Sequence, residues 1–186
     1  MKPLLMAILL VSPLAGLGHS QPASDEPLLF TADLRGQHVA PAAVETPATA
    51  RATAVLVGDK FTVHGSFAGL SSPLRDIEKK PDDPGIHLHR GAPGETSPYF
   101  QGLRVRLNAD ERSGIFYGTA TLDAEHLKLL LSNRTYVDIH TVKHGPGEVR
   151  DQWRPLDPAA ARRRGVLEAR QPPHRVQMAT GSCHGP

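Results

Sequence analysis

The stretch TARATAVLVGDKFTVHGSF, residues 49–67, decides the fold class because apolar and polar residues alternate along it. A side-chain period of two is the pattern of a β-strand with one buried face. Gly58 and Asp59 interrupt the alternation near its centre, and such a pair between two alternating runs is typical of a tight hairpin turn. The stretch therefore predicts two antiparallel strands.

Six more short runs with strand-like patterns lie along the chain, and turn residues separate them. Eight short strands indicate an all-β protein, and we expect an antiparallel immunoglobulin-like or Greek-key β sandwich. One short crossover helix is expected at residues 122–134, because Asp123 suits the N-cap and Leu127, Leu130 and Leu131 share one side. The six further runs are LLFTADLRG, GIHLHRG, GLRVRLNA, SGIFYGTATL, RTYVDIHTV and GEVRDQWRP.

The two ends of the chain differ in composition from the part that holds the strands. Residues 1–20 combine one lysine, an apolar run and small residues near Gly18, which is the layout of a signal peptide; a retained anchor is the alternative. Residues 154–186 contain six arginines against two acidic residues, with several prolines, and we expect a basic, disordered tail. The sequence thus predicts an exported protein, periplasmic or secreted, with one domain over residues 28–153 and no membrane span after signal removal.

Charge and cysteine content exclude some classes of function. Residues 21–153 carry fourteen lysines and arginines against seventeen acidic residues, so the folded part is mildly acidic and no nucleic-acid binding is expected. Cys183 is the single cysteine, so no internal disulfide can form. The segment from Ser71 to Gly85 is polar and interrupted by prolines, which indicates a surface loop.

Two of the predicted strands carry histidines on one face. In GIHLHRG, His87 and His89 share a face, and in TYVDIHT, Tyr136, Asp138 and His140 share a face. The intervening residues are aliphatic and are expected to point into the core. If the two strands pair, the polar faces converge.

Such a convergence has two interpretations. Imidazole nitrogens bind Cu²⁺ or Zn²⁺ at about 2.0–2.1 Å, so His87, His89 and His140 could hold copper or zinc, with Asp138 as a fourth ligand or as a group that orients a ring. Alternatively, these histidines bond to loop backbones or face water and bind no metal. Separations of about 3–4 Å between the ring nitrogens favour the metal site, and separations of about 8 Å or more exclude it.

Signs of catalysis are weak, and we lean toward a non-enzymatic protein. The chain has no G-x-S-x-G, H-E-x-x-H or glycine-rich phosphate loop. The carboxylate pairs Asp82–Asp83 and Asp110–Glu111 lie in predicted turns and are expected to be solvated. Four further histidines stand alone and are expected to have no functional role: His38, His64, His126 and His144.

Three segments together resemble a known family. The chain carries an early pair of prolines, an H-x-H-x-G-x-P-G segment, and a Tyr-Val-x-x-His-Thr segment followed by Pro-Gly-Glu-x-Arg. This combination, over residues 28–153, closely resembles the CHRD domain, a module named from chordin and frequent in exported bacterial proteins. The resemblance implies an immunoglobulin-like β sandwich that acts as a binding or structural module for an unknown extracellular or periplasmic partner; it supplies no reaction.

This chain departs from the family pattern at three places. The loop from Ser71 to Gly85 is longer and more charged than usual, Arg90 stands where the family tends to have glycine, and Asp151 replaces a glycine. A second, weaker resemblance is to the copper half of the copper/zinc superoxide dismutases, which use an H-x-H strand and a later histidine. The further zinc ligands and the disulfide of those enzymes are missing, so the resemblance extends to metal binding and not to dismutase activity.

Overall fold

The structure is a computed structural model that describes residues 26–75 and 85–170. The expected signal peptide, the Asp82–Asp83 pair, Cys183 and the end of the expected tail lie outside the described residues. The elements, in chain order, are β1 (Leu28–Arg35), η1 (Gly36–His38), β2 (Thr49–Val57), β3 (Lys60–Ala68), β4 (Ile86–Arg90), β5 (Tyr99–Gly102), β6 (Arg104–Leu107), β7 (Gly114–Thr121), α1 (Ala124–Leu131), β8 (Thr135–Ile139), β9 (Val149–Gln152), β10 (Arg154–Pro155) and α2 (Pro158–Arg170).

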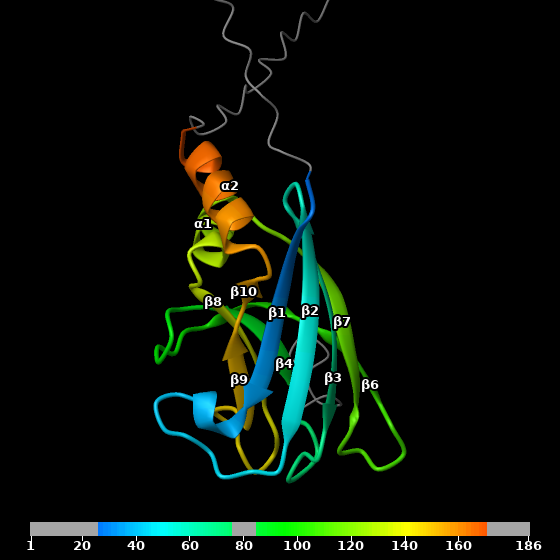
Figure 1. Cartoon of the computed structure of the whole chain (residues 1–186). Helices are drawn as coiled ribbons and strands as arrows, with labels where there is room; N and C mark the ends of the chain where they lie inside the picture. Colours follow the sequence, from blue (N-terminus) through cyan, green and yellow to red (C-terminus); the bar gives the residue numbers. More distant parts are fainter. Residues whose placement is uncertain (1–25, 76–84, 171–186) are drawn as a thin grey trace, which may run out of the picture.

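The strands form one antiparallel, hydrogen-bonded sheet that is nearly closed. Its order is β5-β4-β8-β9-β1-β2-β3-β7-β6, with β10 paired to β1. The two ends of this order, β5 and β6, are separated in the chain only by Leu103, whose N–H donates to the Ile86 carbonyl at 2.9 Å. The long strands β1, β2, β3 and β7 form one wall, and β9 continues it beside β1 (Figure 1). The predicted all-β antiparallel class is therefore confirmed.

The alternating pattern that predicted the hairpin is the pattern of burial. Along β2 the exposed and buried residues alternate strictly, and β2 pairs with β3 up to Val57 opposite Lys60, with Gly58 at a positive φ in the turn. The buried faces of the strands enclose one core. Aromatic rings meet edge to face at its centre, where Phe61 lies 5.6 Å from Phe30 and 5.2 Å from the fully buried Trp153.

All eight predicted runs form strands, and two details differ. The run GEVRDQWRP divides at Trp153 into β9 and β10, because the Trp153 N–H donates to the Thr135 carbonyl at 3.0 Å and the chain then turns to pair with β1. Strand β5 was not predicted, because its residues lack the alternation of a half-buried strand and are exposed or half-buried throughout.

The two helices lie at one end of the sheet (Figure 1). Helix α1 begins as expected, with the Asp123 side chain accepting the His126 backbone N–H at 2.8 Å, and it buries Leu127 and Leu130. Helix α2 differs from the expected disordered tail. The Asp157 side chain accepts the backbone N–H groups of residues 159 and 160, and the alanine-rich first turns bury Ala161. Within the described residues, no helix is both long enough and apolar enough to span a membrane.

Candidate metal centre

Pairing between β4 and β8 brings the predicted site residues together. The antiparallel register places His87 opposite Asp138 and His89 opposite Tyr136, and His140 follows directly after β8. One potential ligand atom from each of His87, His89, Asp138 and His140 lies within 4.8 Å of the others. Every separation in this group is therefore well below the 8 Å that would exclude a metal site. A bound ion would draw the cluster inward, because two ligands about 2.1 Å from one ion are at most ~4.2 Å apart.

Both faces of these strands are buried, which the sequence did not predict. Ile86, Leu88, Val137 and Ile139 lie in the core as expected. The histidine face is also covered, with His87 only 1% exposed. Covering groups come from segments outside the two strands: the Tyr99 ring stacks on His87 at 4.3 Å between centroids, and the loops that contain Ser97 and Gly145 bond to His89 and His140.

Two carbonyl groups fix the protonation of two imidazoles. His89 Nδ1 lies 2.7 Å from the Ser97 carbonyl oxygen, and His140 Nδ1 lies 2.8 Å from that of Gly145. A carbonyl oxygen only accepts, so each Nδ1 carries the hydrogen. In the neutral ring, Nε2 then presents a lone pair, which is the arrangement that a metal-binding imidazole uses.

The two Nε2 atoms converge on one carboxylate oxygen. Asp138 Oδ1 lies 3.0 Å from His89 Nε2 and 3.0 Å from His140 Nε2, and 3.9 Å from His87 Nδ1. If both rings were neutral, lone pairs would face an ionised oxygen at these distances. The arrangement therefore requires positive charge between these atoms, supplied either by protons on Nε2 or by a cation.

Ionisation of the cluster follows from this geometry. Burial alone would raise the pKa of the Asp138 carboxyl, but the imidazoles of His140 and His89 outweigh burial and hold that pKa well below its usual range. Burial likewise opposes the charged form of His140, but Asp138 outweighs it and raises the pKa of that imidazole. Without a metal, both shifts favour a charged imidazolium–carboxylate pair between His140 and Asp138.

A second layer of side chains supports the cluster. The Tyr136 ring stacks on His89, with centroids 4.5 Å apart and planes 7° from parallel. The guanidinium carbon of Arg150 in β9 lies 3.3 Å from the Tyr136 ring centroid, a cation–π contact. Arg150 is buried, and the sequence analysis did not single it out. The sequence did contain a signal for Arg150. It is a charged residue in a predicted strand, beside a face that already carries histidine and aspartate.

Glu148 fastens three loops beside the cluster. Its buried carboxylate accepts hydrogen bonds from the hydroxyl groups of Thr46 and Thr141, at 2.5 and 2.7 Å, and from the Ser71 backbone N–H at 2.9 Å. Burial would raise the pKa of Glu148, but these hydrogen bonds outweigh it and lower the pKa. Thr141 directly follows His140, so Glu148 helps to fix the end of the segment that carries this histidine.

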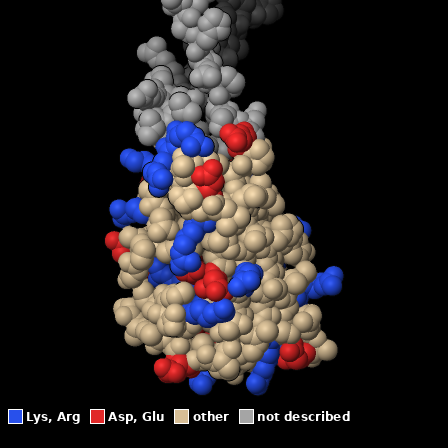
Figure 2. All heavy atoms as spheres, in the orientation of Figure 1, with Lys and Arg blue, Asp and Glu red and all other residues tan. Residues whose placement is uncertain are grey.

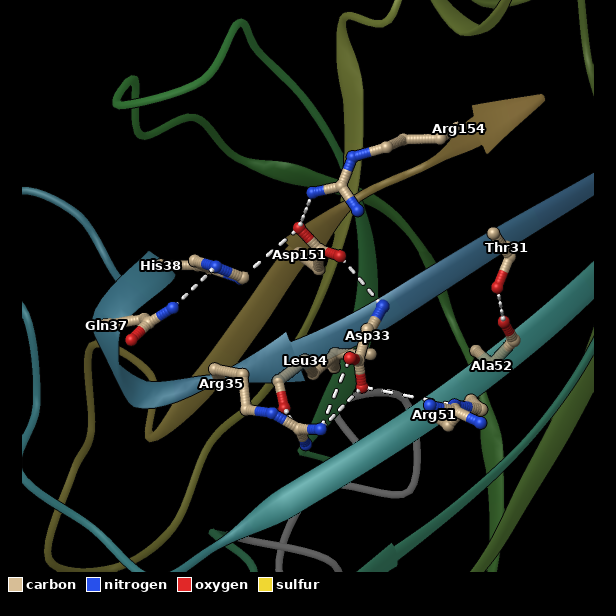
Figure 3. Close-up of polar contacts among 10 residues, drawn as sticks. All are labelled: Thr31, Asp33, Leu34, Arg35, Gln37, His38, Arg51, Ala52, Asp151 and Arg154. Carbon is tan, nitrogen blue, oxygen red and sulfur yellow. Dashed lines mark hydrogen bonds and ion pairs between the residues drawn. The ribbon is translucent and has the colours of Figure 1, made fainter. Parts of the chain in front are cut away.

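Asp151 joins β9 to β1 and η1 (Figure 3). Its buried carboxylate accepts the Asp33 backbone N–H and an Arg154 N–H, each at 2.7 Å, and lies 3.3 Å from His38 Nδ1. This role explains why an acidic residue is accommodated where a glycine was expected. Figure 2 shows basic side chains around a central acidic patch on the face over β1 and β2, where Arg35 pairs with Asp33 at 2.9 Å.

A pocket of about 340 Å³ opens beside the cluster. His89, Asp138 and His140 line one part of it. The rest of the lining comes from Tyr136 and Arg150 and from three loops: Val39, Ala40, Pro41, Thr96, Ser97, Pro146 and Gly147. The candidate centre is thus a buried cluster with a small chamber next to it.

Several other residues singled out from the sequence make local contacts that belong to turns, caps or the exposed surface. His64 is exposed and stacks on Tyr117 at 6.5 Å, and His126 contacts the N-cap Asp123. Asp110 caps its own turn through the backbone and side chain of Ser113, as expected for a turn carboxylate. Arg90, a departure from the family pattern, lies 3.7 Å from Glu125 in an exposed ion pair.

These features define an all-β, exclusively antiparallel module with a buried histidine–carboxylate cluster between neighbouring strands. The family model of the CHRD domain matches residues 30–153, so the chain belongs to the CHRD domain family, as the sequence motifs predicted. No curated protein and no solved structure matches the chain.

The motifs that suggested the family meet around the cluster. The H-x-H segment supplies His87 and His89, the Tyr-Val-x-x-His-Thr segment supplies Tyr136 and His140, and the Glu-x-Arg segment supplies Glu148 and Arg150. Segments distant in the sequence thus contribute to one place in the fold.

Proposed function

We propose that this CHRD domain binds one copper or zinc ion through His87, His89 and His140, with Asp138 as a fourth ligand. The single observation that carries the proposal is the pair of Nδ1–H···O=C hydrogen bonds at His89 and His140, which leave both Nε2 atoms available at 3.0 Å from one carboxylate oxygen. Three imidazoles and one carboxylate are a donor set that suits Zn²⁺ and Cu²⁺.

Energetics support a cation at this position. Burying polar and charged groups is costly unless they are paired. His89 Nε2 is buried, and it shares the Asp138 oxygen Oδ1 with His140 Nε2, each at 3.0 Å. An ion at the centre would satisfy this nitrogen and the carboxylate together.

The test is equilibrium titration of tag-free, full-length protein with Zn²⁺ and Cu²⁺ in competition with a chelator of known affinity. We expect one ion per chain, and at least tenfold weaker binding, about 1.4 kcal/mol, when any one of His87, His89 or His140 is replaced by alanine. His64→Ala is the matched control, because His64 is exposed on the opposite wall. Equal affinity in all four variants would reject the site.

A second candidate function is a binding or structural module without metal, as family membership also suggests. The observation that favours it is the ionised His140–Asp138 pair, which together with the bonds to Ser97 and Gly145 can hold the loops without an ion. In that case each alanine substitution lowers stability, and added metal leaves the melting temperature unchanged.

We also propose that the protein is exported, either to the periplasm or to the medium, and acts on a partner there. The support is the apolar run and the small residues near Gly18 in residues 1–20, which have the layout of a signal peptide. Mass spectrometry of protein from the producing cells should find a mature chain that begins near Gln21. Intact Met1 on the mature protein would contradict export by a cleaved leader.

A further inference from the structure

Arg150 is a buried cation, and one of its guanidinium nitrogens is unsatisfied within the described part of the chain. Its residue is 4% exposed, and its Nη2 atom has no hydrogen-bond partner among the described residues. Asp138, its register partner on β8, is a nearby group of opposite charge; burial lowers the pKa of Arg150, and Asp138 opposes that shift. The Asp138 oxygen Oδ1 is occupied with His89 and His140, and no ion pair joins it to the guanidinium within the described part of the chain.

Arg150 is one of the residues that line the pocket described above. One face of its guanidinium stacks on the Tyr136 ring. A buried guanidinium with free N–H groups is a strong recognition element for planar oxyanions, because its fork of donors matches a carboxylate in bidentate geometry. Leaving such a group unpaired is costly, so a ligand that pairs with it is favoured.

The other walls of the pocket select among anions. Val39, Ala40, Pro41 and Pro146 present apolar surface, while Thr96 and the Ser97 segment present polar groups at the rim. A chamber of about 340 Å³ is larger than an inorganic anion needs and has room for a small organic molecule. The apolar walls would bury the organic part while Arg150 holds the charged part.

We propose that this pocket binds a small organic carboxylate, with Arg150 as the residue that recognises the carboxylate group. Because His89, Asp138 and His140 line the same chamber, the inference names a ligand class for the centre proposed above and rests on that proposal for the ligand's position beside a metal. Recognition by Arg150 itself does not require the metal. The two proposals can therefore fail separately.

The experiment is calorimetric titration of the full-length chain, once after treatment with chelator and once loaded with Zn²⁺. The probes are benzoate, acetate and inorganic phosphate at constant ionic strength. Benzoate is expected to bind the metal-free protein with one site and at least tenfold more tightly than phosphate. Arg150→Gln should weaken benzoate binding at least tenfold.

Three further variants keep the test valid if Arg150→Gln does not fold. Thr96→Phe fills the rim of the pocket from an exposed position and leaves Arg150 in place, so it should also weaken benzoate binding. Thr119→Phe makes the same change at an exposed position of β7 and should leave binding unchanged. Arg150→Lys should retain the charge but lose the bidentate contact, giving a smaller loss than Arg150→Gln.

Three outcomes would overturn the inference: equal affinity for phosphate and benzoate, unchanged benzoate binding in folded Arg150→Gln or Thr96→Phe, or binding only to zinc-loaded protein regardless of Arg150. Benzoate binding by metal-free protein that takes up no Zn²⁺ or Cu²⁺ would support the carboxylate pocket and reject the metal site. Metal binding without any carboxylate binding would do the reverse.

Discussion

Replacing Glu148 by glutamine tests whether this buried carboxylate holds the loops around the candidate centre. The substitution keeps the shape of the side chain but removes its charge. The hydrogen bonds from Thr46, Thr141 and the Ser71 N–H then become neutral, and the amide nitrogen can no longer accept one of them.

The magnitude follows from these three contacts. A hydrogen bond to a charged group contributes roughly 1.5–3 kcal/mol and a neutral one roughly 0.5–1.5, so the change costs about 1 kcal/mol per bond. The amide is easier to bury than a carboxylate, which offsets part of this loss. We expect Glu148→Gln to lower the free energy of unfolding by about 2 kcal/mol at pH 7, or roughly 4–8 °C in melting temperature.

The stability lost in Glu148→Gln should depend on pH in a way that identifies its cause. The pKa of Glu148 is lower in the folded state than its reference value of 4.5, so its contribution is complete above about pH 4.5 and is lost as the pH falls through the folded-state pKa. The difference between the wild-type protein and Glu148→Gln should therefore shrink in acid. Urea denaturation at pH 7 and at several values below 4.5 measures it.

The control for this prediction is Glu45→Gln, which makes the same change at an exposed position and should alter stability by less than about 0.5 kcal/mol. A loss for Glu148→Gln that is no larger than that of the control would refute the reasoning. So would a loss that stays constant as the pH falls.

Three further predictions concern the centre, the core and α2. A hundredfold excess of Zn²⁺ over its dissociation constant should stabilise the protein by about 2.7 kcal/mol at pH 7.5, and this gain should vanish near pH 5 as the imidazoles bind protons; scanning calorimetry measures both. Gly65→Ala should cost about 1–3 kcal/mol in urea denaturation, because its new methyl group would lie 2.2 Å from the Phe116 ring; an unchanged midpoint would contradict this packing. Truncation after Pro155 should lower the melting temperature, because it removes the buried Ala161 beside α1; an unchanged value would favour the disordered tail expected from composition.

Local rules predicted much of the fold. Alternation placed β2 and β3 and their turn at Gly58, and the N-cap preference of aspartate placed the start of α1 at Asp123. These features depend on neighbours in the sequence. Helix α2 was missed because arginines and prolines in its surroundings suggested disorder, whereas burial of Ala161 depends on contact with another helix.

The sequence predicted the candidate site only on the condition that the two strands that carry the histidines pair with each other. Strand period gave the common face of His87 and His89 and that of Asp138 and His140, but no local rule states that β4 pairs with β8. Burial of the histidine face depends on Tyr99 and on distant loops, which sequence spacing does not position. Arg150 was missed for the same reason, because its partner Tyr136 belongs to another strand.

Competition between protons and metal follows from the ionisation of the centre. Because Asp138 raises the pKa of His140, the metal-free cluster keeps the proton on this imidazole to a higher pH than an ordinary histidine does, and metal binding must displace that proton. Measured in buffers of different ionisation enthalpy, the heat of Zn²⁺ binding should therefore depend on the buffer at pH 7.

The most direct measurement of the central claim is electron paramagnetic resonance of tag-free, full-length protein titrated with Cu²⁺ at pH 7.5. Imidazole nitrogens bound to copper add hyperfine structure to its spectrum, so the account predicts one nitrogen-coupled signal that saturates at one copper per chain. The signal should weaken or change its nitrogen coupling in His140→Ala and stay the same in His64→Ala. A spectrum of copper without nitrogen coupling, or a nitrogen-coupled signal that is unchanged when His87, His89 and His140 are replaced in turn, would contradict a metal centre between β4 and β8.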